Sequence, residues 1–265
     1  MKIAHISDLH FGAHDPEVCD LLLANILDAE ADLVIASGDI TQSSTDAEFA
    51  QAQAFFARFP MPIFMVPGNH DLPGMDLARF INPFGRYKRF LTDDLNPELA
   101  TPLVHIKGIN TARRILPHWN WANGSVSARQ CRQVEESFAA SSAPWRLFVL
   151  HHPLMSPKEF PLDITVFNSA ELLKTIANTQ IDIVLAGHQH HAYIETRQDC
   201  VMEEDHMTLF VSASTAMSTR IRRQPQGFNM LHFTETSVRI DMLRYDNGAF
   251  TIFEAVTHTK AVDTA

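Results

Sequence analysis

Metal-ligating side chains follow five apolar runs of this 265-residue chain, each time directly after the run ends. The five segments read Asp8-Leu9-His10, Gly38-Asp39, Gly68-Asn69-His70-Asp71, His151-His152-Pro153 and Gly187-His188-Gln189-His190. Their carboxylate, amide and imidazole groups could together bind two neighbouring divalent cations. A cation pair of this kind can generate hydroxide at neutral pH and hold a phosphate at the same time.

The mixture of oxygen and nitrogen donors limits the choice of metal. It suits Mn, Fe, Zn or Co, whereas the absence of thiolates argues against Cu(I) and iron–sulfur clusters. The three cysteines, Cys19, Cys131 and Cys200, lie far apart and form no CxxC motif. We therefore expect reduced thiols rather than a disulfide framework or a thiolate zinc site.

The apolar runs are expected to be buried strands that bring the five segments together. Strands are predicted at 3–6, 33–36, 62–66, 103–106, 146–150 and 181–185, and helices at 16–29, 45–59, 130–140 and 170–178. The order of these elements indicates parallel βαβ units, and ligands collect at the carboxyl ends of strands in such sheets. Period-two alternation predicts antiparallel strands at 193–195, 208–213, 228–233, 238–243 and 250–256.

Charge and termini narrow the class of protein. The net charge is −10 and the chain has no Lys/Arg-rich run, which argues against a stable nucleic-acid complex or a nuclease with a basic groove. Met1-Lys2 leads directly into an apolar strand without the layout of a signal peptide, and no apolar stretch is long enough to cross a bilayer. We expect a single cytoplasmic domain over 1–265.

Two segments lie outside the predicted strands and helices of the two βαβ halves, or extend beyond them. Residues 74–102 are predicted to form either a cap insertion over the site or a pair of packed surface helices. This segment is also apolar enough to seat an acyl chain, and either it or an edge strand could form a homodimer contact. Residues 257–265 are expected to be a loose polar tail.

The ordered set of motifs closely resembles the calcineurin-like metallophosphoesterase superfamily. Its pattern runs D-x-H, G-D, G-N-H-D/E, H and G-H-x-H, and this chain matches every element between Asp8 and His190. Each motif is weak alone, but the full set in this order is highly specific. The resemblance implies an α/β fold: a four-layer α-β-β-α sandwich with two mixed sheets and a metal site at the carboxyl ends of the strands.

The resemblance also implies a role for each residue. Asp8, His10 and His190 would bind one metal ion, Asn69, His151 and His188 would bind the other, and Asp39 would lie between the two. His70 would stand near the phosphate, without binding metal, and would donate a hydrogen bond or proton to an oxygen of the substrate. Asp71 would orient His70. His151 is preferred to His152 as the ligand because the family's ligand lies two residues before the proline.

Substrate choice stays open among several phosphate esters. The motifs are most similar to the class III cyclic-nucleotide phosphodiesterase branch, with glycerophosphodiesterases nearly as close, although Asn110 departs from the Asp expected in the cyclic-nucleotide group. A branch that hydrolyses a UDP-linked lipid A precursor commonly has Arg at the position of His70. Hydrolases of other lipids, phosphomonoesterases and a non-catalytic scaffold are further alternatives.

Several cationic and aromatic side chains are candidates for contacts with the substrate. Asn69, His70, Arg220 and Arg222 could meet the phosphate, and Arg223 belongs to the same cluster; a solvated loop explains the arginines equally well. Trp119 and Trp121 could stack on a base, or simply pack in a flap.

Overall fold

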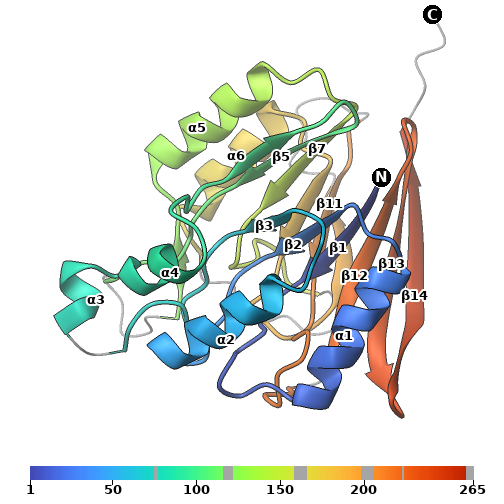
Figure 1. Cartoon of the computed structure of the whole chain (residues 1–265). Coiled ribbons are helices and arrows are strands. Elements are labelled where there is room, and N and C mark those ends of the chain that lie inside the picture. Colours follow the sequence, from blue (N-terminus) through green and yellow to red (C-terminus); the bar gives the residue numbers. More distant parts are fainter. Residues whose placement is uncertain (75–76, 116–121, 158–165, 198–205, 223, 261–265) are drawn as a thin grey trace, which may run out of the picture.

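Two six-stranded sheets face each other in the computed structural model, which describes residues 1–74, 77–115, 122–157, 166–197, 206–222 and 224–260 (Figure 1). The first sheet has the order β14-β13-β12-β1-β2-β3. Its strands are β1 (Lys2–Ile6), β2 (Leu33–Ala36), β3 (Ile63–Met65), β12 (Gly227–Phe233), β13 (Ser237–Asp246) and β14 (Ala249–Thr259). Strands β1 to β3 are parallel, and β12 joins β1 antiparallel, so this sheet is mixed.

The second sheet has the order β10-β11-β9-β7-β5-β4. Its strands are β4 (Glu98–Ala100), β5 (Val104–Gly108), β7 (Trp145–Val149), β9 (Ile183–Ala186), β10 (Tyr193–Arg197) and β11 (Thr208–Ser212). It is also mixed, because β5, β7, β9 and β11 are parallel while β4 and β10 run antiparallel to their neighbours. The predicted α/β fold with two mixed sheets is thus confirmed.

Helices cover the outer faces of both sheets. Helices α1 (Pro16–Asp28) and α2 (Asp46–Phe56) lie on the first sheet, and α5 (Ala128–Ala139) and α6 (Ser169–Asn178) lie on the second (Figure 1). Three apolar clusters fill the spaces between these layers, with the central one between the two sheets. The order of layers is therefore helix, sheet, sheet, helix, as predicted.

Local capping explains where the helices near the site begin. The Asp15 carboxylate accepts from the first backbone N–H groups of α1, and Pro16 occupies its first turn. Thr45 and Glu48 form a capping box at the start of α2. Helix α2 consequently starts immediately after the loop that carries Asp39.

Segment 74–102 combines elements that the sequence did not separate. It contains α3 (Leu77–Ile81), α4 (Gly85–Phe90) and β4. Helix α4 buries Tyr87, whose ring meets Phe49 of α2 edge-on at 6.2 Å, so this helix packs against α2. Strand β4, which we did not predict, adds an edge strand to the second sheet.

Two other sequence predictions were wrong in detail. Strand β11 runs antiparallel to β10, as predicted, but parallel to β9, because an alternating pattern reveals which face is buried but not the direction of each neighbour. Strand β14 continues to Thr259, so the tail expected to be loose from 257 begins with three paired residues. Residues 261–265 lie outside the described residues. A two-stranded sheet of β6 (Gly124–Ser125) and β8 (Val166–Phe167) was also missed.

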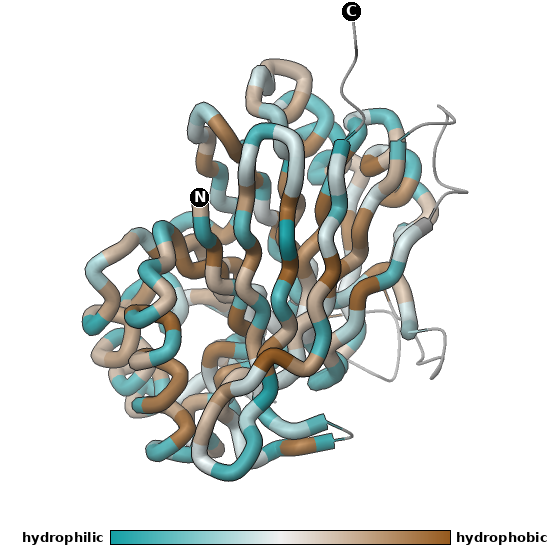
Figure 2. The backbone as a smooth tube through the Cα atoms, turned by 90° about the vertical axis from the view of Figure 1, so that its right-hand side faces the viewer, coloured by the Kyte–Doolittle hydropathy of each residue, from teal (hydrophilic) through white to brown (hydrophobic). Residues whose placement is uncertain are grey.

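The hydropathy of β13 and β14 fits their position at one side of the molecule, where one face of the first sheet is exposed. Figure 2 shows hydrophilic and hydrophobic residues alternating along the strands on the side of β13 and β14. Such strands bury one face and expose the other. Among the described residues, no helix combines the length and the apolar character needed to span a bilayer.

Candidate metal centre and active site

The predicted ligands converge at the carboxyl ends of β1, β2, β7 and β9. Their donor atoms form overlapping groups in which all atoms lie within 4.8 Å of one another. These groups are Asp8–His10–His190, Asp8–Asp39–His151, His10–Asp39–His70 and His151–His152–His188. Segments up to 180 residues apart in sequence therefore form one cluster, which is what two adjacent cations require.

The Asp39 carboxylate lies between two halves of this cluster. Its Oδ2 is 3.3 Å from His151 Nε2 and 3.9 Å from His10 Nε2. On the side of His10, the His190 Nε2 atom is 3.1 Å from His10 Nε2 and 3.2 Å from Asp8 Oδ1. Asp39 thus lies between His10 and His151, whereas the division of the ligands between two ions stays a prediction.

The ligands sit on sharp turns rather than on extended backbone. Asp8 and His10 have φ angles of 52° and 49°, and Asp39, His188 and His190 are also left-handed. The spacing of two residues between Asp8 and His10 would also allow both to point to one ion from extended backbone, but the structure shows turns instead. Their amides donate to the carbonyls of Gly38 and Asp39, which fixes the turn. Left-handed backbone at non-glycine residues is costly and concentrates at functional sites.

Backbone carbonyls orient two of the imidazole rings. His151 Nδ1 is 2.8 Å from the Ser37 carbonyl, and His190 Nδ1 is 2.8 Å from the Arg220 carbonyl. Because a carbonyl oxygen only accepts, each Nδ1 must carry the hydrogen. Each Nε2 therefore faces the cluster and can give its lone pair to a cation, which is the usual way that proteins prepare histidine for a metal.

Unsatisfied polar atoms show that the cluster fits cations. Asp8 Oδ1, Asn69 Oδ1 and His151 Nε2 are buried without a hydrogen-bond partner in the described structure. Buried polar atoms without partners are rare in folded proteins, and an unrecorded ion is one explanation for them. Two cations, one at Asp8 and the other at Asn69 and His151, would satisfy all three.

The charges within the cluster favour ligation. Burial alone would raise the pKa of Asp39, but His151 beside it holds that pKa well below its usual range. Burial opposes a charge on His151, yet Asp39 overcomes it and raises the pKa of this imidazole to about 9. The same negative charge that favours a proton on His151 would favour a cation at this position. Burial lowers the pKa of His188 to about 3 and that of His10 to about 4, so both rings are neutral and able to ligate.

His152 has no nitrogen left for a metal. Its Nδ1 is 2.7 Å from Thr111 Oγ1, and its Nε2 is 2.9 Å from the Ala122 carbonyl. Since both nitrogens are engaged within the protein, His152 supports the ring of His188, which lies 4.6 Å away between centroids.

Asn110, which replaces the Asp expected in the cyclic-nucleotide group, caps its own turn by accepting from the Ala112 amide.

Asp71 does not have the role that we predicted for it. Its carboxylate accepts from the amides of Ile40, Thr41 and Gly68, and so joins the two loops that carry Asp39 and Asn69. Burial and the nearby Asp39 raise the pKa of Asp71 to about 6. The His70 ring is instead held by the Gln42 carbonyl, 2.7 Å from its Nδ1. A backbone acceptor leaves no signal in the sequence, so Gln42 was missed.

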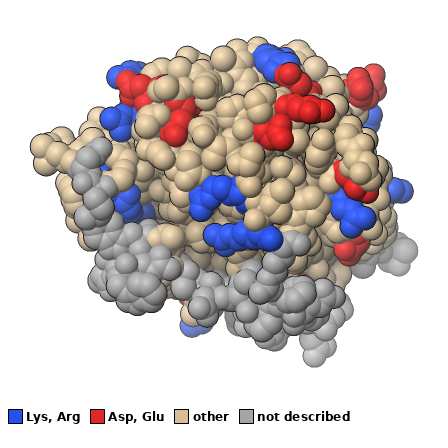
Figure 3. Space-filling view, turned by 90° about the horizontal axis from the view of Figure 1, so that it is seen from below, with Lys and Arg blue, Asp and Glu red and all other residues tan. Residues whose placement is uncertain are grey.

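The two arginines predicted to meet substrate differ in their surroundings. Arg220 Nη1 lies 3.1 Å from His70 Nε2 and 3.1 Å from Gln42 Oε1. Arg222 is exposed, but its charge contributes to the lowered pKa of His188. Figure 3 shows cationic side chains near the centre of the underside, which is the face towards which β1 runs. Arg223, Trp119 and Trp121 lie outside the described residues.

A hidden polar network behind the site was also missed. His5 is fully buried, and burial lowers its pKa to about 3. Its Nε2 lies 2.9 Å from Ser37 Oγ, and Asn229 Nδ2 donates to its Nδ1 at 3.2 Å. The network reaches the site because the Ser37 carbonyl is the acceptor for His151.

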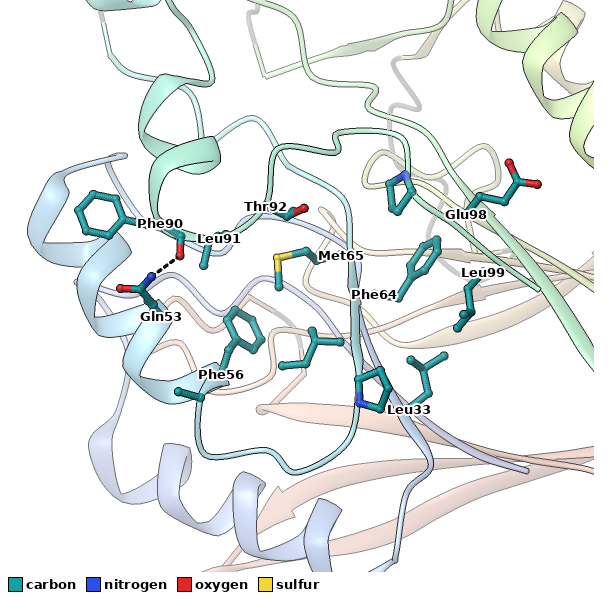
Figure 4. Close-up of a pocket in the computed structure, with 14 residues that line it drawn as sticks. Leu33, Gln53, Phe56, Phe64, Met65, Phe90, Leu91, Thr92, Glu98 and Leu99 are labelled. Atoms are coloured by element: carbon teal, nitrogen blue, oxygen red, sulfur yellow. Dashed lines mark hydrogen bonds between the residues drawn. The ribbon is translucent and has the colours of Figure 1, made fainter. Parts of the chain in front are cut away.

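Two hollows differ in their relation to this cluster. One of about 370 Å³ adjoins it and is lined by Gln42, Ser43, Asn69, His70, Leu72, Gly74, Arg79 and Ala122. A larger cavity of about 510 Å³ lies between α2, β3, α4 and β4, and apolar side chains such as Phe56, Phe64 and Met65 line it (Figure 4). Volume alone would therefore select the apolar cavity instead of the hollow beside the ligand cluster.

Comparison with known proteins agrees with the motifs. Residues 1–192 match the family model described as calcineurin-like phosphoesterase. A probable cyclic nucleotide phosphodiesterase from Synechococcus is 25% identical over 244 residues, which cover 87% of each chain. A glycerophosphodiester phosphodiesterase from Enterobacter lignolyticus is 29% identical over 207 residues, covering 72% of this chain and 71% of its own.

A solved structure shares the fold. The dimetal phosphatase from Danio rerio superposes with a TM-score of 0.71 at 13% identity, over 98% of this chain and 99% of its own. At this identity the likeness concerns the fold alone. The match to the family model extends over most of the chain and contains every ligand described above, and with it the chain belongs to the calcineurin-like phosphoesterase family and is a metallophosphoesterase.

Proposed function

We propose that this protein is a phosphodiesterase that uses two divalent cations and acts on small phosphodiesters, foremost cyclic nucleotides. The observation that carries the proposal is the ligand cluster, in which buried donor groups from both sheets converge and three donor atoms, of Asp8, Asn69 and His151, have no hydrogen-bond partner among the described residues. The names of relatives that align along most of their length supply the substrate class.

Each ligand has a defined task in this proposal. Asp8, His10 and His190 would hold one ion, Asn69, His151 and His188 the other, and Asp39 both. When bound, such ions supply a hydroxide nucleophile at neutral pH and neutralise charge on the phosphate. Asp39 also accepts from the His70 amide at 2.8 Å, and thereby keeps that ring beside the cluster.

The hollow beside the cluster favours a polar organic group over a lipid. Gln42, Ser43 and Arg79 form the polar part of its wall. The guanidinium of Arg79 donates to the carbonyls of Pro73 and Arg114. Aromatic residues of 74–102 do not line it; among them Tyr87, Phe84 and Phe90 pack in the apolar cluster beneath α1 and α2. A volume of about 370 Å³ lies within the range for small-molecule sites.

The alternatives keep the same metal chemistry and change the organic group. A glycerophosphodiester is supported by the Enterobacter lignolyticus relative, whereas a nucleotide-linked lipid or a phosphomonoester has weaker support. A non-catalytic scaffold is disfavoured because every ligand position carries a ligating residue. Location in the cytoplasm and formation of a homodimer stay predictions.

One substrate panel tests the proposal. Manganese-loaded protein is assayed against cyclic AMP, a glycerophosphodiester, a UDP-linked lipid and simple monoesters, ranked by kcat/KM. We expect the highest value for cyclic AMP. A lipid or a monoester as the best substrate would contradict the substrate class, although not the metal chemistry.

A variant tests the metal assignment independently. Asp39→Ala should lower bound metal below two ions per chain, measured by elemental analysis, and abolish turnover. Asp20→Ala, in an exposed aspartate paired with Arg58, is the matched control and should keep both. Full metal content with undiminished turnover in Asp39→Ala would refute the assignment.

A further inference from the structure

Helix α3 turns its charged side chain inward and its large apolar side chains outward. Leu77 and Ile81 are 72% and 73% exposed, the highest values among the large apolar residues that the structure describes. They are four positions apart, so they share one face of the helix, which we call the α3 face. Arg79, between them in sequence, is only 6% exposed. An exposed apolar pair beside a buried cation reverses the ordinary pattern of a surface helix and indicates a contact site.

Hydrogen bonds fix this orientation of the helix. The Arg79 guanidinium donates to the carbonyls of Pro73 at 2.6 Å and Arg114 at 2.8 Å. The Arg114 guanidinium donates back to the Phe80 carbonyl at 2.9 Å, so α3 and this second loop are joined in both directions. Ile115, the next residue of that loop, is also exposed. Because these bonds hold Arg79 inward, the helix cannot rotate to bury the α3 face without breaking them.

The segment that carries the α3 face is cationic, although the chain as a whole is acidic. Residues 77–92 contain four of the 21 Lys and Arg residues and none of the 31 Asp and Glu residues, in a chain whose net charge is −10. Arg86 and Arg89 of α4 share a single acidic partner, Asp46. Lys88 and Arg114 are exposed, and neither forms an ion pair with another described residue. Exposed cations beside exposed apolar side chains complement a surface that is both anionic and apolar.

The position of α3 leaves this face accessible to a large partner. Figure 1 shows α3 at an outer corner of the molecule, on the side away from β13 and β14. The inner side of the helix borders the hollow beside the ligand cluster, because Arg79 and Gly74 line that hollow. A partner can therefore meet the α3 face without entering the hollow.

A second copy of the chain fits the α3 face less well than a lipid surface does. Two copies that met through this face would bring two cationic segments together, and like charges repel. One short helix also offers only a small part of the roughly 800 Å² that each partner of a stable interface buries. An anionic bilayer has the opposite charge, and even a small apolar insertion adds to its attraction for cations.

We propose that this protein binds anionic lipid surfaces peripherally through the α3 face and the cations of residues 77–92. Leu77 and Ile81 enter the headgroup region, while Lys88 and Arg114 meet lipid phosphates. The inference goes beyond the proposed function, because the lipid is a docking surface and not the substrate. It does not depend on the activity of the protein, so its test and the substrate panel can fail separately.

Co-sedimentation of the full chain with vesicles tests the proposal. The probe is vesicles of equal parts phosphatidylglycerol and phosphatidylcholine, and vesicles of phosphatidylcholine alone are the comparison. We expect the wild type to bind the anionic vesicles more tightly, and added salt to weaken this binding because it screens surface charge. Equal binding to both kinds of vesicle, or no binding to the anionic ones, would overturn the proposal.

Paired variants test which residues make the contact. The double variant Leu77→Ser/Ile81→Ser should bind anionic vesicles about 10-fold or more weakly, because the apolar insertion is lost. Its matched control is Ile252→Ser, in a β14 residue that is 52% exposed, which should bind as wild type. Lys88→Glu should weaken binding about 5-fold or more. Lys174→Glu makes the same change of charge at an exposed position of α6 and should have a much smaller effect. Equal losses within either pair would contradict the proposal.

Two further measurements separate lipid binding from misfolding and from self-association. The substituted side chains are exposed, so every variant should keep the Tm of wild type by calorimetry. Analytical ultracentrifugation without lipid should give the same mass for wild type and for Leu77→Ser/Ile81→Ser. A dimer that this double variant dissociates, together with the absence of vesicle binding, would assign the α3 face to a second copy of the chain and overturn the proposal.

Discussion

The two hollows of this protein show how differently a site and a space between elements are built. The one beside the metal cluster is smaller, lies at the carboxyl ends of strands, and borders buried donors that have no protein partner. The larger one lies at the free edges of both sheets, where β3 and β4 end their sheets, and apolar side chains line most of it (Figure 4). Unsatisfied chemistry, rather than volume, therefore identifies the functional region.

The largest expected effect comes from a small change at the cluster. A Cβ at Gly187 would collide with Ser7 Oγ and the Asp8 carboxylate, whereas a Cβ at Gly74 would meet nothing within 4 Å. Gly187→Ala should therefore weaken metal binding by about 10- to 100-fold or more, as changes next to a ligand do. Gly74→Ala is the matched control and should bind metal normally. Equal metal affinity of the two variants, measured by calorimetry, would contradict the importance of the close contact at Gly187.

A substitution in the wall of the apolar cavity should lower the free energy of unfolding without changing metal binding. Phe64 is 5% exposed and lines this cavity from β3. Phe64→Ala should cost about 3–5 kcal/mol of unfolding free energy, because buried aromatic contacts are lost and the space is enlarged. Urea denaturation measures the loss, and elemental analysis should still find two ions per chain. Loss of metal without loss of stability would contradict this division.

Removal of metal should lower the stability of the folded protein, and this effect should depend on an intact ligand cluster. A ligand that binds only the folded state at about 100 times its Kd adds roughly 2.7 kcal/mol to stability. Chelation should therefore lower the Tm of wild type, measured by calorimetry, and restoring manganese should raise it again. In Asp39→Ala the same treatment should shift the Tm much less. An identical shift in both proteins would show that the chelator acts elsewhere.

The smallest effect is expected behind the site. Ser37→Ala removes the hydroxyl that meets His5 Nε2 but keeps the carbonyl that holds His151. The buried His5 nitrogen would lose its partner, at a cost of about 1–3 kcal/mol in unfolding free energy. Metal stoichiometry should stay at two ions per chain. Loss of one ion in this variant would mean that the network, and not the carbonyl alone, sets the His151 ring.

The sequence predicted which residues meet, but not how the backbone brings them together. Asp8, Asp39 and His188 were found because an apolar run followed by a polar turn marks a strand end. The left-handed turns at those residues were missed, since positive φ is uncommon even for Asp and His, which adopt it more often than most other residues. The Gln42 carbonyl was missed for a related reason, because every residue type offers the same acceptor.

Long-range pairing was the other part that the sequence could not supply. Arg220 lies 150 residues from His70, and only the folded chain brings its guanidinium to that ring. Strand β4 has three residues in an irregular segment, too few to show a pattern. The direction of β11 depends on its neighbour β9, which alternation along one strand does not specify.

The predicted ligands come from both sheets, which gives bound ions a mechanical role. Asp8 and Asp39 follow strands of the first sheet, and His151 and His188 follow strands of the second. At the opposite end the protein itself connects the sheets: Trp145 Nε1 donates to the Thr234 carbonyl at 2.7 Å, and Lys260 pairs with Asp182 at 2.6 Å. Removal of the metal should therefore allow the two sheets to separate locally at one end only. Amide hydrogen exchange should become faster near the carboxyl ends of β1 and β9, while amides at the opposite end of the sheets stay protected.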